Sequence, residues 1–121
     1  TFIQEFDLLM KKELILIEYD KSIQEAMEKI IFNKTRTIFV TKNLKIIGTI
    51  SEGDILRSLN DKKNLQTPLI NIINKNFKYL EEKNSSVAEA KKLFKKFSVL
   101  IIPVLDKKGK LKSLYHINDI L

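Results

Sequence analysis

Apolar residues recur at helical spacing in two stretches of this chain, residues 23–31 and 87–97. Side chains three and four positions apart lie on one face of a helix, so each stretch predicts an amphipathic helix. Both follow a Ser with a Glu three residues later, at Ser22 and Ser86, a spacing typical of a helix N-terminal capping box. The two Ser residues are 64 positions apart, which indicates that the chain contains the same unit twice.

Two short strands are predicted after each of these helices. Residues 37–41 and 45–50 are rich in β-branched and apolar residues, and residues 99–105 and 110–115 correspond to them in the second half. Proline has no backbone N–H to donate, so Pro103 predicts an edge or end position for its part of the strand.

The motif Asp-Ile-Leu occurs at position 54 and again at position 119, an offset of 65. The second unit therefore has one additional residue, which we place in its longer turn at residues 106–109. An extended entry strand is expected before each first helix, at residues 14–17 and 77–80. Between the units, Thr67-Pro68 predicts a helix start with Pro at the first helical position.

The predicted fold class is α/β (α+β), with two pseudo-symmetric β-α-β-β-α repeats packed through their sheets and the helices outside. Residues 13–62 form the first repeat and residues 63–121 the second. Residues 1–12 are expected to be a connecting helix from an upstream domain. The chain begins without Met and its last helix is short, so we expect a truncated last helix and a longer parent protein.

Composition excludes several classes of site. The 121 residues include 44% hydrophobic residues, enough for a core, but no Cys and a single His. Thiol nucleophiles, disulfides and ordinary zinc sites are therefore excluded. The longest apolar run, residues 99–105, is far shorter than the ~20 residues that span a membrane. No signal peptide is visible, so a cytoplasmic location is expected.

The chain is basic, with a net charge of +7. Its Lys doublets are scattered along the sequence, as on solvated faces, and no basic segment has the pattern of a recognition helix. We therefore expect neither a nucleic acid nor a membrane as partner. A positive surface still favours small polyphosphate anions by electrostatic steering.

Candidate chemistry is concentrated in residues 48–55, Gly-Thr-Ile-Ser-Glu-Gly-Asp-Ile. A strand here delivers the Ser51 hydroxyl, Gly53 and the Asp54 carboxylate to the start of a helix, where free N–H groups favour an anion. The hydroxyl can meet a phosphate, and Gly53 permits close approach of a ligand. An ionised Asp accepts hydrogen bonds only, which suits the two ribose hydroxyls of a nucleotide.

A purely structural interpretation of the same residues remains open. Ser51 with Asp54 three residues later is also a capping-box pattern that needs no ligand. The second copy departs from the first, because His116 stands where the hydroxyl belongs and Asn118 replaces the Gly, although Asp119 is retained. Imidazole can donate to phosphate, but a His at a helix start is commonly only a cap.

From about residue 8 to its end, the chain resembles a tandem pair of CBS domains, a Bateman module. The resemblance rests on Ser-Ile-Gln-Glu-Ala and Ser-Val-Ala-Glu-Ala at the two helix starts, on Ile-Pro-Val at 102–104 and on residues 48–55. In that family the hydroxyl-x-x-Asp motif binds adenosine nucleotides. The resemblance implies that Asp54 holds the ribose, that Ser51 holds the phosphate and that Thr49 lines the base pocket.

The resemblance also implies that each cleft takes its other wall from the partner repeat. Residues expected beside the Asp54 site are Tyr79, Val99, Leu100 and Ile101. Residues expected at the second site, with His116 and Asp119, are Met10, Ile15, Arg36, Thr37 and Leu114.

The function implied by the resemblance is that of a regulatory module. It would bind an adenosine nucleotide of the AMP, ADP or ATP class between the repeats, require no other cofactor or metal, and modulate an attached enzyme. A narrower likeness, carried by residues 48–57, 64–68 and 72–76, is to the CBS pairs of bacterial sugar-phosphate nucleotidyltransferases. The chain itself is not expected to be an enzyme, since it contains no evident nucleophile–base pair.

The alternative is a dimerisation module that has kept the fold and lost the ligand. In either case the resemblance implies a homodimer. The apolar residues expected at its contact are Leu56, Leu59, Ile3 and Phe6.

Overall fold

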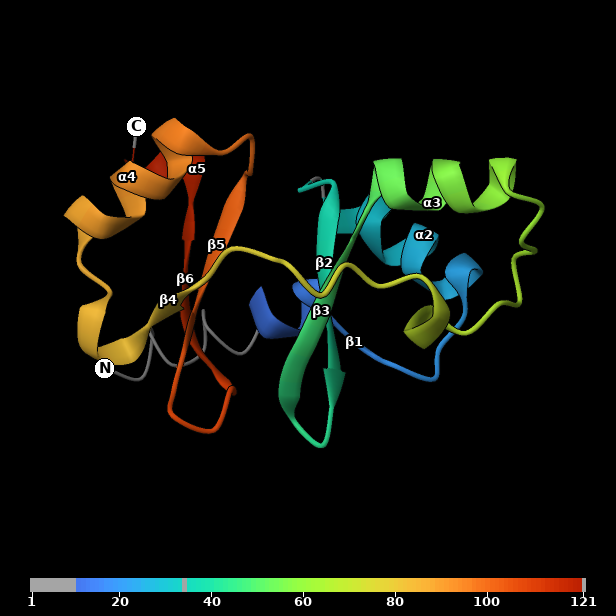
Figure 1. Cartoon of the computed structure of the whole chain (residues 1–121), viewed down its shortest axis with the longest axis horizontal. Coiled ribbons are helices and arrows are strands. Elements are labelled where there is room, and N and C mark those ends of the chain that lie inside the picture. The colour runs from blue at the N-terminus through green and yellow to red at the C-terminus, as the bar shows by residue number, and fades with distance from the viewer. Residues whose placement is uncertain (1–10, 34, 121) are drawn as a thin grey trace.

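The computed structural model describes residues 11–33 and 35–120, which form two units of the same element order lying side by side (Figure 1). Residues 11–15 are helical, and the rest of the connecting helix predicted for residues 1–12 lies outside the described residues, as do Ile3, Phe6 and Met10. The elements of the first repeat are β1 (Leu16–Glu18), α2 (Ile23–Asn33), β2 (Thr37–Lys42), β3 (Lys45–Ser51) and α3 (Glu52–Asn60).

The second repeat has the same order with shorter outer elements. A linker with one 3-10 turn, Leu69–Asn71, leads into it, and a second 3-10 turn, Glu82–Asn84, precedes its first helix. Its elements are β4 (Leu80–Glu81), α4 (Val87–Lys96), β5 (Ile101–Leu105), β6 (Leu111–His116) and α5 (Ile117–Ile120).

The two sheets have the same topology, which confirms the predicted repeat. β1 and β4 run parallel to the central strands β2 and β5, and these pair antiparallel with β3 and β6. Both central strands have a register shift at the same place, after Val40 in β2 and after Val104 in β5. The position of Pro103 differs from the prediction because β5 is central. β4 pairs only with residues 104 and 105, so no partner on that side needs the N–H that Pro103 lacks.

The hydrophobic core has three parts, and the middle part joins the repeats. One cluster packs α2 and α3 on the first sheet, and another packs α4 on the second. The middle cluster lies between the sheets and takes Phe39 and Ile46 from the first repeat and Ile101, Leu105 and Leu111 from the second. The helices lie on the outer sides (Figure 1), so the predicted packing through the sheets is confirmed.

The linker is less regular than predicted. Pro68 precedes a single 3-10 turn, and no side chain caps it. The linker lacks a longer helix because its backbone pairs with the first repeat. The carbonyl of Thr67 accepts from the Ile23 N–H at 3.1 Å, and the Leu69 N–H donates to the carbonyl of Lys21 at 2.9 Å. These long-range backbone bonds hold the segment where local propensity favoured a helix.

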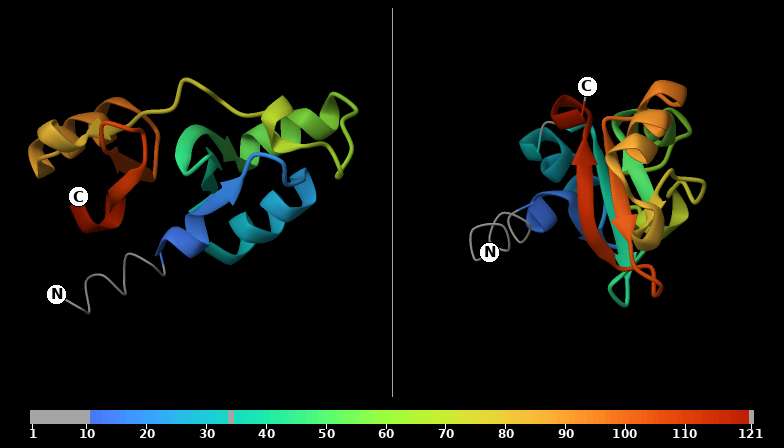
Figure 2. Two further views of the ribbon diagram at one scale, coloured as in Figure 1. Left: turned by 90° about the horizontal axis from the view of Figure 1, so that it is seen from below. Right: turned by 90° about the vertical axis from the view of Figure 1, so that its left-hand side faces the viewer.

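The entry strand predicted for residues 77–80 is reduced to Leu80–Glu81. The preceding linker residues instead cross from one repeat to the other on one face of the molecule, yellow in Figure 1 and along the top of the left-hand view in Figure 2. No helix within residues 11–33 and 35–120 is long and apolar enough to cross a membrane. Leu56 of α3 is exposed, but Leu59 packs against the first core and is a poorer candidate for a dimer contact than predicted.

Candidate functional site

A cavity of about 860 Å³, which we call the inter-repeat cleft, lies where three segments meet. The first is the end of β3 with the start of α3, the second is the linker, and the third runs from the end of α4 into β5. The lining residues used below are Arg36, Thr37, Thr49, Ser51, Glu52, Gly53, Asp54, Arg57, Asn74, Asn76, Phe77, Lys78, Phe94, Lys95, Lys96, Phe97, Val99, Leu100, Ile101 and Ile117.

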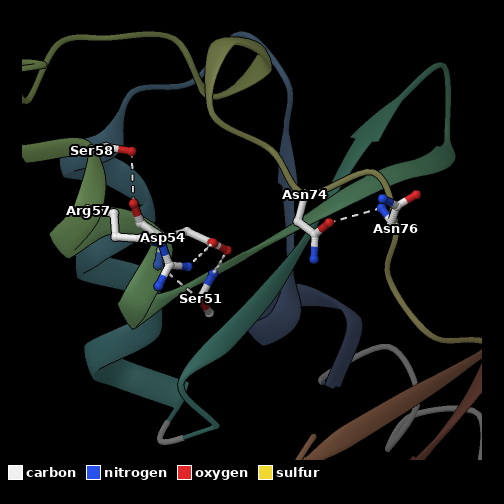
Figure 3. Close-up of polar contacts among 6 residues, drawn as sticks. All are labelled: Ser51, Asp54, Arg57, Ser58, Asn74 and Asn76. Carbon is white, nitrogen blue, oxygen red and sulfur yellow. Dashed lines mark hydrogen bonds and ion pairs between the residues drawn. The ribbon is translucent and has the colours of Figure 1, made fainter. Parts of the chain in front are cut away.

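The start of α3 is closed by a complete capping box (Figure 3). The Asp54 N–H donates to Ser51 Oγ at 3.2 Å, and the Ser51 N–H donates to Asp54 Oδ2 at 2.9 Å. Two of the free N–H groups at this helix end are therefore satisfied within the chain. The capping box expected from the spacing of Ser51 and Asp54 is therefore confirmed.

Arg57 covers the same carboxylate. Its Nη2 lies 2.6 Å from Asp54 Oδ1, and its side chain is 72% exposed, whereas that of Asp54 is 19% exposed (Figure 3). The guanidinium also lies over Gly53, where an added Cβ would come within 3.2 Å of Arg57 Nη1. Each carboxylate oxygen of Asp54 has one partner, so each keeps a second lone pair for another donor.

Thr49 and Thr37 approach the motif from two strands. Thr49 is buried in β3 and lines the cleft. The antiparallel register pairs Thr37 of β2 directly with Ser51, which places Thr37 beside Asp54. Thr37 and Arg36, which were predicted beside Asp119, thus line the inter-repeat cleft together with Asp54.

The linker forms the second wall by pairing with the open edge of β3. Asn74 and Thr49 exchange two backbone hydrogen bonds of 2.9 and 3.0 Å. Gly48 makes this approach possible, because a Cβ there would lie 2.9 Å from the Asn74 carbonyl oxygen. Asn74 Oδ1 then accepts from the Asn76 N–H at 2.9 Å, turning the chain along the cleft (Figure 3).

Tyr79 does not line this cleft, contrary to the prediction. Phe77, two residues earlier, takes that position, and Tyr79 stacks at a tilt against it with ring centroids 5.4 Å apart. Tyr79 faces a separate cavity of about 720 Å³ beside the β5–β6 turn. The linker is irregular here, so strand alternation could not indicate which aromatic ring points into the cleft.

The third wall is apolar and comes from the second repeat. Val99, Leu100 and Ile101 lie in the cleft with Asp54, as predicted. Phe94 and Phe97 from the end of α4 add aromatic surface to the cleft. From the sequence they were expected only on the apolar face of the helix predicted over residues 87–97. Such a wall suits a flat, partly apolar group such as a purine base.

Positive charge distinguishes the inter-repeat cleft from the other cavities. Five cationic side chains face two carboxylates, a net charge of +3. In a cavity of about 760 Å³ beside α2, three lysines face four glutamates, and in the cavity beside the β5–β6 turn three lysines face three carboxylates. The cationic residues of the cleft are Arg36, Arg57, Lys78, Lys95 and Lys96.

The second predicted site is not assembled in the same way. His116 Nδ1 accepts from the Asn118 N–H at 3.1 Å, and Asp119 is exposed at the start of a four-residue helix. Ile15 is buried in the middle core and Leu114 packs against it. None of the three cavities described above includes these residues, and α5 contributes only Ile117 to the inter-repeat cleft.

The first repeat is similar to a known protein family. Residues 4–61 match the family model of the CBS domain. An uncharacterized protein of Rickettsia prowazekii is 32% identical over 112 residues, which cover 90% of this chain. The chain spans 34% of the length of that relative.

Solved structures extend the likeness to both repeats. The crystal structure of a CBS domain, 27% identical, covers 88% of this chain and 83% of its own with a TM-score of 0.73. A CBS domain protein of Pyrobaculum aerophilum, complexed with AMP, is 21% identical and covers 89% and 87% of the two chains with a TM-score of 0.71. A CBS domain pair in complex with 5′-methylthioadenosine and S-adenosyl-L-methionine is 20% identical, with coverages of 88% and 83% and a TM-score of 0.71.

CBS modules are regulatory rather than catalytic, so these matches confirm the prediction that the chain is not itself an enzyme. The likeness spans both sheets and their helices, in agreement with the predicted fold class. The CBS family model thus matches the first repeat, and the two repeats together have the fold of a CBS domain pair.

Proposed function

We propose that this chain is a regulatory module that binds an adenosine nucleotide in the inter-repeat cleft and modulates an attached catalytic domain. The observation that carries the proposal is the joining, in one cavity, of the α3 start, an aromatic wall and a net positive lining. These three features match the ribose, base and phosphate of a nucleotide. Structures of similar fold contain AMP in one case and adenosine derivatives in another, which supports the same ligand class here.

In this proposal Asp54 accepts hydrogen bonds from the two ribose hydroxyls. Each of its oxygens already accepts one bond, from Ser51 N–H or from Arg57, and has capacity for one more. The Ser51 hydroxyl is assigned to the first phosphate, and Gly53 at the start of α3 leaves room for it. Arg57 is the residue of this site that we expect to move when the nucleotide binds, because its exposed guanidinium can turn from Asp54 to the phosphate.

The base is assigned to the wall formed by Thr49, Leu100 and Ile101. A purine packed there contacts both repeats at once, because Thr49 comes from β3 whereas the other two come from the second repeat. A ligand that contacts both repeats favours the relative pose that it binds best. Its occupancy is then coupled to any neighbouring domain that differs in its fit to the two poses.

The attached domain is proposed from the sequence likeness to be a sugar-phosphate nucleotidyltransferase. The repeats are proposed to extend over residues 13–62 and 63–121. The test is an assay of the full-length protein for nucleotidyl transfer to sugar phosphates, with and without adenosine nucleotides. A full-length protein that contains no catalytic domain contradicts this part of the proposal.

A second candidate function, a ligand-free dimerisation module, is favoured by one observation. The capping box satisfies Ser51 and Asp54 without any ligand, and Leu56 on the outer face of α3 is 68% exposed. In that case α3 is an interface helix, and the cleft has no ligand. Light scattering on the full-length protein measures the dimer, but it does not separate this function from the first, since both include a homodimer.

Thermal unfolding with added nucleotide separates the two functions. A ligand that binds only the folded chain stabilises it by about 2.7 kcal/mol at one hundred times its dissociation constant. For a domain of this size the melting temperature is then expected to rise by several degrees. AMP, ADP, ATP and S-adenosylmethionine are each measured against guanosine as a control nucleoside. No rise with any adenosine compound rejects nucleotide binding and leaves the dimerisation module.

A further inference from the structure

Two lysines that are 18 positions apart in the sequence each contact the same aromatic ring in the inter-repeat cleft. Lys78 Nζ of the linker lies 4.4 Å from the centroid of the Phe97 ring, and Lys96 Nζ of α4 lies 5.5 Å from the same centroid. All three residues line the cleft. We refer to Lys78 and Lys96 as the lysine pair.

The lysine pair has no carboxylate partner within the part of the chain that the structure describes. The ion pairs there join other residues, and the two carboxylates of the cleft, Glu52 and Asp54, lie at the α3 start, where Asp54 is bound to Arg57. The π face of Phe97 attracts both ammonium groups but does not neutralise their charge. An anion that contacts both ammonium groups would neutralise it.

Arg36 continues the positive lining toward the α3 start. Its backbone has φ +62°, a conformation that residues other than glycine rarely adopt. Its carbonyl accepts from the Glu52 N–H at 3.1 Å, which fixes this turn against the first residue of α3. The cleft lining therefore has cationic side chains at Arg36 and Arg57, next to the α3 start, and at the lysine pair, next to Phe97.

We infer that the cleft selects adenosine triphosphate over adenosine monophosphate, and that the lysine pair binds the terminal phosphates. This inference rests on the proposed function, since it needs the adenosine and the first phosphate at Asp54 and Ser51. A monophosphate leaves the lysine pair without an anion. A triphosphate extends from the α3 start and carries its additional negative charge to the second group of cations.

The test measures the affinity of the protein for AMP, ADP and ATP by isothermal titration, without added divalent metal. The variant Lys78→Gln/Lys96→Gln removes the pair and keeps Phe97. The control Lys91→Gln/Lys112→Gln removes the same charge from two exposed positions that line none of the three cavities. All four lysines are exposed, so neither double variant disturbs the core.

We expect the parent and the control to bind ATP about tenfold more tightly than AMP, the factor expected for two charge-assisted contacts to exposed groups. The lysine-pair variant should bind ATP and AMP alike and keep the parent's affinity for AMP. Added salt should weaken the ATP preference of the parent, because exposed charges are screened.

The same measurements distinguish a failure of the inference from a failure of the proposed function. Equal affinity of the parent for AMP and ATP overturns the inference and leaves the proposed function standing. An equal loss of ATP affinity in the variant and the control also overturns it, because steering by total charge then accounts for the effect. If no adenosine nucleotide binds the parent, the proposed function fails and the inference fails with it.

Discussion

The starts of α3 and α5 occupy the same place in the two repeats and differ in their chemistry. At α3 the Ser51 hydroxyl and the Asp54 carboxylate close a capping box, and Arg57 pairs with the carboxylate. At α5 the ring nitrogen of His116 accepts from Asn118, and the Asp119 side chain is exposed. Only the first start combines a hydroxyl, a glycine and a partly buried carboxylate.

The backbone beneath these two starts is nearly the same. Thr37 pairs with Ser51 in the first sheet, and Ile101 pairs with His116 at the equivalent place in the second. The polar-to-apolar change from Thr37 to Ile101 thus accompanies the loss of the hydroxyl at the helix start. The two repeats therefore share a scaffold but differ in the side chains on which the proposed site depends.

The largest expected effect comes from removing the carboxylate of the first copy. Asp54→Ala leaves the ribose hydroxyls without an acceptor, which should cost about 1.5–3 kcal/mol of binding free energy, or roughly ten- to a hundredfold in affinity for AMP and ATP. Asp119→Ala, the control in the second copy, should change the affinity much less. Isothermal titration of both variants measures the comparison. If Asp54→Ala retains the parent's affinity and only melts earlier, Asp54 is a helix cap alone.

A second comparison concerns the strand residue where the linker crosses β3. Gly48 and Ser113 are equivalent, since they pair with Val40 and Val104, but only Gly48 lies against the linker. Gly48→Ala places a Cβ 2.9 Å from the Asn74 carbonyl and should destabilise the fold by about 1–3 kcal/mol, because backbone must move. Denaturant unfolding measures it.

The controls for this change use glycine and serine positions without such a contact. Ser113 is exposed, so Ser113→Ala should be close to neutral. Gly53→Ala meets only the end of the flexible Arg57 side chain at 3.2 Å and should also cost little stability. A Gly48→Ala variant as stable as these two would show that the linker does not depend on its contact with β3.

A smaller effect is expected from the cap residues themselves. Ser51→Ala removes the acceptor for the Asp54 N–H and should lower the free energy of unfolding by about 1 kcal/mol, the usual value for a lost N-cap. His116→Ala should cost less, because its hydrogen bond to Asn118 is exposed. Thermal unfolding of both variants without nucleotide tests this order, and a reversed order would contradict it.

The sequence predicted the repeated architecture well because its signals are local. Capping spacings, helical periodicity and the shared motif at positions 54 and 119 each depend on a few neighbouring residues. The inserted residue was placed in the turn after β5, and the structure has its longer turn there. Such signals do not depend on how the two repeats meet.

The cleft could be predicted only in part because its walls meet through tertiary packing. Arg57 was not assigned to the site, since its contact with Asp54 and Gly53 needs the rotamer of an exposed side chain. Lys78 and Lys96 are 18 positions apart and meet only over the Phe97 ring. In the sequence they look like ordinary solvated lysines.

The smallest expected effect concerns the hairpin turns, which also differ between the repeats. The first turn has Asn43 and Leu44 at positive φ, whereas in the second Asp106 Oδ1 accepts from the N–H groups of Lys108 and Lys110 at 2.8 and 3.0 Å. The hydrogen bond from Lys110, with help from that of Lys108 and from nearby lysine charges, lowers the pKa of Asp106 below its ordinary value.

A carboxylate whose pKa is lower in the folded chain stabilises the fold above its unfolded pKa, and this contribution is lost as the pH falls through the folded pKa. NMR titration should therefore find Asp106 ionised at a pH where an unstructured Asp is already partly protonated. Asp106→Asn, whose amide oxygen still accepts both bonds, should keep the turn and remove this part of the acid dependence of unfolding. An ordinary pKa for Asp106, or the same acid dependence in the variant, would contradict the role of this turn.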